Sequence, residues 1–102
     1  MADTADIIKG TDIPITLINL PVGIDIKRLD FAQNGEIVIT KTHNDFTIDG
    51  TTGVCEITQS EALKLDARCP VEIQLAYHID GKARRTYITT IPVRRILYEG
   101  EV

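Results

Sequence analysis

The nine residues from Val71 to Ile79 alternate between large apolar side chains and polar or small ones, and an Asp-Gly pair follows them directly. A period of two places every second side chain on one face of an extended strand. Asp80-Gly81 is a preferred two-residue turn between antiparallel strands. The segment from Ala83 to Ile91 alternates again and is predicted to be the returning strand. This hairpin restricts the chain to folds with an antiparallel sheet that buries one face.

The rest of the chain also favours strands. Ile, Val and Thr make up 34 of the 102 residues, and β-branched side chains of this kind prefer extended backbone. Apolar runs bounded by Gly, Pro and Asn predict further strands at Ile13–Leu20, Arg28–Gln33, Glu36–Lys41, Phe46–Ile48 and Val54–Thr58.

Asn34-Gly35 predicts a tight turn between two of these strands, but it leaves the register open. A two-residue loop would place Phe31 opposite Val38. A three-residue loop would place Phe31 opposite Ile37 instead. Because a shift of one residue moves a strand's side chains to the other face, the two registers predict different cores.

One short helix is expected. Thr58-Gln59-Ser60-Glu61 matches a capping box, in which the threonine hydroxyl accepts from the glutamate amide and the glutamate side chain bonds back to the threonine amide. Pro70 disfavours a helical residue before it, so the helix is limited to one or two turns near residues 59–65.

Together these patterns predict an all-β fold, an antiparallel sandwich or small barrel of about seven strands with that one helical turn. At 102 residues the chain is predicted to be one domain, 1–102, with residues 1–10 as an extended N-terminal arm and residues 99–102 as an exposed tail.

Composition and net charge disfavour several classes of function. The net charge is −4, which disfavours general nucleic-acid binding. No apolar run approaches the roughly 18 residues that a membrane span needs, and the acidic start is unlike a signal peptide, so no membrane partner is expected. In a reducing compartment Cys55 and Cys69 are predicted to be free thiols.

The reactive residues do not form a recognisable catalytic or metal-binding pattern. Ser60 lies in the capping box without a nucleophile elbow, and His43 beside Asp45 is more typical of a turn than of a general base. The spacings that structural zinc sites use are missing among the candidate ligands. The candidate zinc ligands excluded in this way are Cys55, Cys69, His43 and His78. We therefore predict no enzyme activity, no catalytic residue, no metal site and no cofactor.

Charge is unevenly distributed along the chain, and this asymmetry suggests an interface. The C-terminal part has a run of cations without an acid, whereas the N-terminal arm is acidic, so contact between subunits through complementary charge is one interpretation. Alternatively, the arginines are ordinary surface residues or pair with internal acids. The candidate interface residues are Lys82, Arg84, Arg85, Arg94, Arg95, Asp3, Asp6 and Asp12.

Three segments resemble the immunoglobulin-like N-terminal domain of phage baseplate upper proteins. They are Ile8-Lys9-Gly10-Thr11-Asp12-Ile13-Pro14-Ile15, the stretch Ile57–Leu65, and the closing hairpin with Ile79-Asp80-Gly81-Lys82 and Tyr87-Ile88. The resemblance implies an immunoglobulin-like β-sandwich that packs against other tail or baseplate subunits. It implies no catalytic residues, and the paired arginines of the closing strands are not a feature of that family.

We therefore expect a structural or assembly protein of a phage or prophage tail or baseplate. It is expected to form a homo-oligomer and to dock to other tail proteins, in the host cytoplasm before assembly and then in the virion. The alternative is a free-standing ligand-binding β-sandwich, for example for carbohydrate, although the chain has no Trp and only three Tyr and two Phe for such a site.

Overall fold

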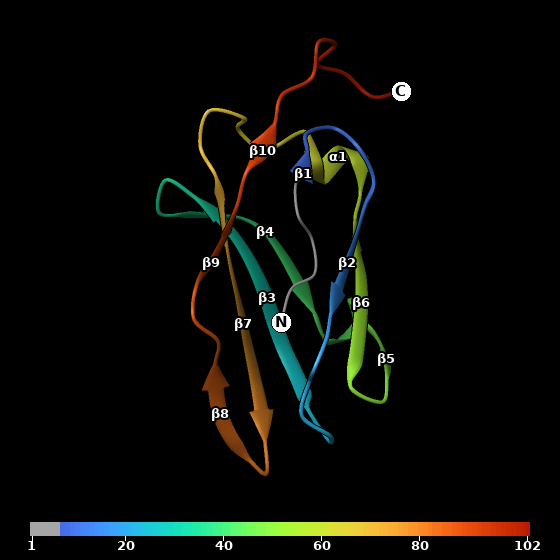
Figure 1. Ribbon diagram of the computed structural model, residues 1–102, viewed down its shortest axis with the longest axis vertical. Coiled ribbons are helices and arrows are strands. Elements are labelled where there is room, and N and C mark those ends of the chain that lie inside the picture. The colour runs from blue at the N-terminus through green and yellow to red at the C-terminus, as the bar shows by residue number, and fades with distance from the viewer. Residues whose placement is uncertain (1–6) are drawn as a thin grey trace.

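The computed structural model describes residues 7–102, which fold into two antiparallel β-sheets packed face to face (Figure 1). In the larger sheet β4 (Glu36–Thr42), β3 (Asp25–Gln33) and β7 (Val71–Ile79) lie side by side, and both β8 (Lys82–Arg85) and β9 (Thr89–Ile91) pair with β7. The smaller sheet has the order β2 (Ile13–Leu17), β6 (Thr52–Ile57), β5 (Thr47–Asp49). The predicted all-β antiparallel sandwich is confirmed.

Three short elements complete the fold. β1 (Ile7–Ile8) pairs in parallel with β10 (Val93–Arg94), which joins the first and last strands at one end of the molecule. His43 and Asp45, which the sequence favoured as turn residues, form the 3₁₀ turn η1 (His43–Asp45) that carries the chain from β4 to β5, and α1 (Gln59–Ala62) follows β6. The whole measures 46 × 26 × 20 Å.

The sandwich has its own strand order. β3 lies between β4 and β7 in the larger sheet. Counting the strands of the two sheets from β2, β3 is the second strand. In immunoglobulin constant domains the second strand lies instead in the sheet that contains the first and fifth strands. The molecule therefore shares the two-layer architecture of such domains, and β3 pairs differently.

The core fills the space between the two sheets with alternate side chains from each. In β7 the burial follows the alternation that the sequence predicted, with the first three apolar positions buried and the polar ones half-buried. The largest side chains with at most 2% exposure come from both sheets and from the loops between them: Phe31, Ile15, Leu17, Leu20, Ile26, Leu29, Ile57, Leu65, Leu75 and Val71.

A bulge sets the register of the β3–β4 hairpin. Asn34 and Gly35 both have positive φ, 53° and 78°, as a two-residue turn of this hand requires. The register then shifts beyond Ala32, and Phe31 lies opposite Ile39, so neither of the predicted partners is correct. Val38 is the extra residue of the bulge. Because of it, the side chains of Ile39 and Lys41 turn toward the core.

The predicted capping box is present at the start of α1. The Thr58 hydroxyl accepts from the Glu61 amide at 3.3 Å, and the Glu61 carboxylate accepts from the Thr58 amide at 2.9 Å. The helix ends after a single turn, and Leu65 beyond it is 1% exposed. This turn thus anchors the crossing from the smaller sheet to the larger one.

Candidate docking surfaces

β8 and β9 form the open edge of the larger sheet. β8 pairs with the second half of β7, and β9 pairs with its first three residues. Within residues 7–102 no strand lies on the outer side of either, so the backbone there is open to a further strand. All four residues of β8 are exposed, which places the predicted interface residues Lys82, Arg84 and Arg85 on this edge.

The edge is interrupted at Thr86, where the sequence predicted a continuous strand from Ala83 to Ile91. The Thr86 amide donates to the Leu75 carbonyl at 3.0 Å, but the Leu75 amide donates to the Thr86 hydroxyl at 3.1 Å. A side-chain oxygen therefore replaces a ladder carbonyl and the strand breaks. Beyond the break Tyr87 is 96% exposed and Ile88 is 57% exposed, so an aromatic and an aliphatic side chain are exposed close to β8.

The cations of β8 have neighbours of the same charge. Arg84 and Arg85 line a hollow of about 150 Å³ together with His78, Lys27 and Arg28. The last two cations are compensated by acids on their own strand, Lys27 by Asp25 and Arg28 by Asp30, each at 2.8 Å. The hydrogen bond from Lys27 lowers the pKa of Asp25, and the hydrogen bond to Asp30 raises the pKa of Arg28.

None of the three cations on β8 forms an ion pair with a described residue. The edge therefore keeps a positive charge that nothing else in residues 7–102 compensates directly.

The other two predicted cations lie at the opposite end of the long axis. Arg94 belongs to β10 and Arg95 follows it, whereas β8 lies at the far end of β7 (Figure 1). Arg95 lines an open groove of about 560 Å³ with Lys9, Lys64 and Arg68. The five basic residues that the sequence suggested as one stripe are thus divided between two separate surfaces.

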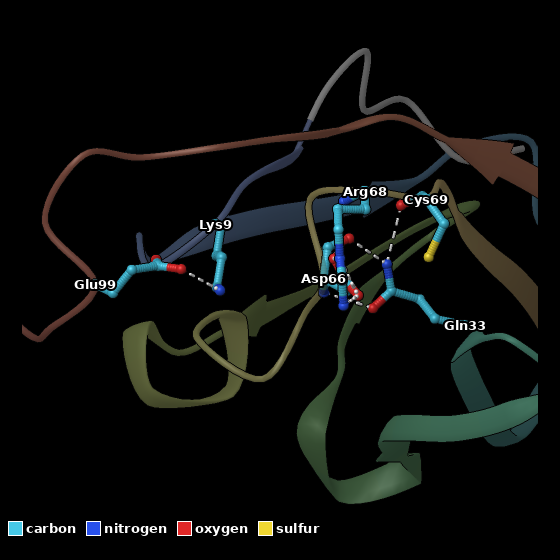
Figure 2. A network of polar contacts seen from close by, with 6 residues as sticks. All are labelled: Lys9, Gln33, Asp66, Arg68, Cys69 and Glu99. Atoms are coloured by element: carbon cyan, nitrogen blue, oxygen red, sulfur yellow. Dashed lines mark hydrogen bonds and ion pairs between the residues drawn. The ribbon is translucent and has the colours of Figure 1, made fainter.

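Polar contacts hold the segments around that groove together (Figure 2). Lys9 Nζ lies 2.7 Å from the Glu99 carboxylate, and so ties the chain after β1 to the C-terminal segment. On the other side Gln33, which is 5% exposed, donates to the carbonyls of Asp66 and Cys69 and accepts from the Asp66 amide, at 2.7, 3.0 and 2.8 Å. Hydrogen bonds from Arg68 lower the pKa of Asp66 to about 2. Hydrogen bonds and ion pairs therefore connect several of the segments that line the groove.

Of the three acidic residues predicted for the interface, only Asp12 lies within the described residues. Asp12 is exposed, and its carboxylate accepts from the Gln59 amide at 2.6 Å, so it helps to cap α1 from a neighbouring segment. Asp3 and Asp6 lie outside the described residues.

Two acids outside the predicted interface, Asp49 and Glu56, give the smaller sheet an acidic surface. β2, β5 and β6 contain no Lys or Arg, whereas Asp49 and Glu56 belong to them and Asp12 and Asp45 adjoin them. On the outer face Val54, 41% exposed, lies between Thr16 of β2 and Thr47 of β5. The available signal was the stretch from Thr42 to Leu63, which contains four acids and no Lys or Arg.

Comparison with known proteins gives no relative. No family model matches the chain, and neither a curated protein nor a solved structure is significantly similar to it. In residues 7–102 no helix has the length and apolar character to cross a membrane. The same residues contain no cluster of three or more His, Cys, Asp or Glu side chains suited to a metal ion. Both thiols are free, Cys55 buried and Cys69 half-buried.

Proposed function

We propose that the protein is a non-enzymatic structural subunit of a phage or prophage tail or baseplate. It acts by self-association and by docking to other subunits of the particle. The virion assignment rests on the resemblance of three sequence segments to a domain of phage baseplate upper proteins. The docking role rests on the structure of the β8–β9 edge.

The observation that carries the docking role is the combination of groups on that edge. A strand edge with open backbone groups can accept a strand from a partner, and the partner's side chains can then add specificity. Tyr and Arg are enriched at protein interfaces, and here Tyr87 follows Arg84 and Arg85 within three residues. Uncompensated cations also discourage two identical edges from pairing, so they favour an acidic partner.

The experiment that tests this proposal measures whether the chain is part of a particle. Particles from a culture that expresses the gene would be purified on a density gradient and analysed by quantitative mass spectrometry. We expect the chain in the particle fraction in a fixed ratio to known tail proteins. A chain that remains entirely in the particle-free fraction would contradict a virion role.

The groove beside Arg95 supports a second candidate, a ligand-binding module. The residues that line it include the apolar Leu63, Leu65 and Ile96 as well as four cations and two acids. Such a site would fit an anionic ligand with an apolar part, for example an acidic saccharide. Thermal shift measurements with a panel of acidic and neutral saccharides distinguish the two, since only a ligand-binding module is stabilised by one class.

A further inference from the structure

We infer that the basic edge β8 of one copy docks on the acidic three-stranded sheet of a second copy, so that the subunits associate head to tail. This inference rests on the proposed assembly function and names one of its partners, a second copy of this chain.

The first step is the charge of the two surfaces. Lys82, Arg84 and Arg85 lie on β8 without an ion pair to any residue from 7 to 102. The smaller sheet carries Asp49 and Glu56 without a cation on any of its strands. In a chain of net charge −4, this separation gives each surface an opposite sign to the other.

The second step is that both surfaces also have exposed apolar side chains near their charges. On the basic edge these are Tyr87 and Ile88. On the acidic sheet they are Val54, 41% exposed, and Ile18, 38% exposed, just beyond β2. An apolar centre with charges around it is the usual composition of a specific interface, because burial supplies affinity while charge selects the partner and its orientation.

The third step is the relative position of the surfaces. β8 lies on one side of the molecule and β5 on the other, as Figure 1 shows with β8 at the lower left and β5 at the lower right. One copy therefore cannot bring its own two surfaces together. Contact between two different surfaces is heterologous, and it generates a ring if the rotation between copies closes and an open filament if it does not.

The experiment uses two charge-reversal variants in sedimentation velocity at low salt. The edge variant carries Arg84→Glu and Arg85→Glu, and the sheet variant carries Asp49→Lys and Glu56→Lys. All four positions are exposed, so circular dichroism and thermal melting should show wild-type folds. We expect the wild-type chain to self-associate, and each variant alone to associate at least tenfold more weakly.

Mixing the variants distinguishes head-to-tail contact from a symmetric one. Each variant keeps one intact surface, and the acidic edge of one variant is again opposite in charge to the basic sheet of the other, so an equimolar mixture of the two should recover the association that each variant alone has lost. A control with Lys64→Glu and Arg95→Glu has the same net charge as the edge variant, but the change lies in the groove at the other end. This control should associate like the wild type.

Two results would overturn the inference. One is a wild-type chain that remains monomeric at low salt; the other is an edge variant that associates as strongly as the wild type. If charge reversal destabilises β8, the neutral variant Arg84→Gln with Arg85→Gln replaces it under the same criterion. Neither result decides the proposed virion role, which the composition of purified particles tests separately.

Discussion

Replacing Glu61 with Gln should destabilise the protein through the buried cation that this carboxylate neutralises. Lys41 is 7% exposed because the bulge in β4 turns it toward the core, and its Nζ lies 2.6 Å from Glu61 Oε1. Gln keeps the oxygen that accepts from the Thr58 amide, so the cap of α1 is retained and only the charge is lost. The substitution therefore isolates the ion pair.

The magnitude follows from the burial of the two partners. Leaving a fully buried charge without its partner costs about 3–5 kcal/mol. The Glu61 side chain is 28% exposed and the Lys41 side chain 8%, so water can partly replace the carboxylate. We therefore expect Glu61→Gln to lower the free energy of unfolding by about 1.5–3 kcal/mol.

The double variant Lys41→Met, Glu61→Gln removes both charges and provides the matched control. Replacing both members of a buried pair by neutral groups of similar size is often close to neutral, so it should lie within about 1 kcal/mol of wild type. The double-mutant cycle also includes Lys41→Met alone, and since that change should not stabilise the protein, the coupling energy measured by urea unfolding at constant m-value should be at least about 0.5 kcal/mol. Additive single-variant effects, with coupling under about 0.5 kcal/mol, would refute the assignment of a stabilising pair.

The same pair makes stability depend on pH. Burial raises the pKa of Glu61, but the hydrogen bonds from Lys41 and Thr58 together outweigh it, so the pKa in the folded protein lies below its ordinary value of 4.5. A depressed folded pKa contributes stability above the unfolded pKa, and this contribution is lost as the pH falls through the folded pKa. The difference in unfolding free energy between wild type and Glu61→Gln should therefore shrink below about pH 4.5. A difference that stays constant from pH 7 to acid would contradict this origin.

Two further predictions concern the ends of the chain and the thiols. Gly10→Ala should lower the free energy of unfolding by about 1–3 kcal/mol, because φ is 74° and the new Cβ would lie 2.9 Å from Ile96 Cδ1. Gly23→Ala, where φ is 80° but no atom lies close to the new Cβ, should cost less in the same urea experiment. Equal losses for the two variants would exclude an effect of the contact with Ile96. A thiol reagent such as DTNB should label half-buried Cys69 in the folded protein. Burial raises the pKa of Cys55 to about 11, so this thiol should react only on unfolding, and early labelling of both would contradict its burial.

The local patterns of the sequence were sufficient for the architecture and for several of its details. The alternation from Val71 to Ile79 gives the central strand of the larger sheet, since burial follows a period of two whatever the partner strand is. The capping box at Thr58 forms as predicted because it depends only on residues within one turn. Asp80 and Gly81 have positive φ, 51° and 75°, as their turn requires.

Features that depend on long-range pairing could not be read from the same patterns. The break at Thr86 needs the Leu75 amide, eleven residues earlier, as hydrogen-bond donor. The burial of Lys41 needs both the bulge at Val38 and a carboxylate twenty residues later in the chain. A hydrophobic pattern alone assigns a lysine to the surface, because an unpaired buried cation is costly.

The candidate interface also has features that follow from local patterns and features that depend on long-range pairing. The exposure of Lys82, Arg84 and Arg85 followed from their place after a turn on a closing strand. Their separation from Arg94 and Arg95 did not, since it depends on the broken edge and on the pairing of β10 with β1. The acids of the smaller sheet, Asp49 and Glu56, lie close together in the sequence, but the sheet that carries them is complete only when β2 pairs with β6.

The measurement that tests self-association through charged surfaces most directly is the molar mass of the wild-type chain by light scattering, across protein concentration and salt. At low salt we predict a mass above the 11.3 kDa of one chain that rises with concentration. It should fall back toward one chain at about 0.5 M salt, where the Debye length of roughly 4 Å screens exposed charges. A mass of 11.3 kDa at every concentration and every salt would contradict the account.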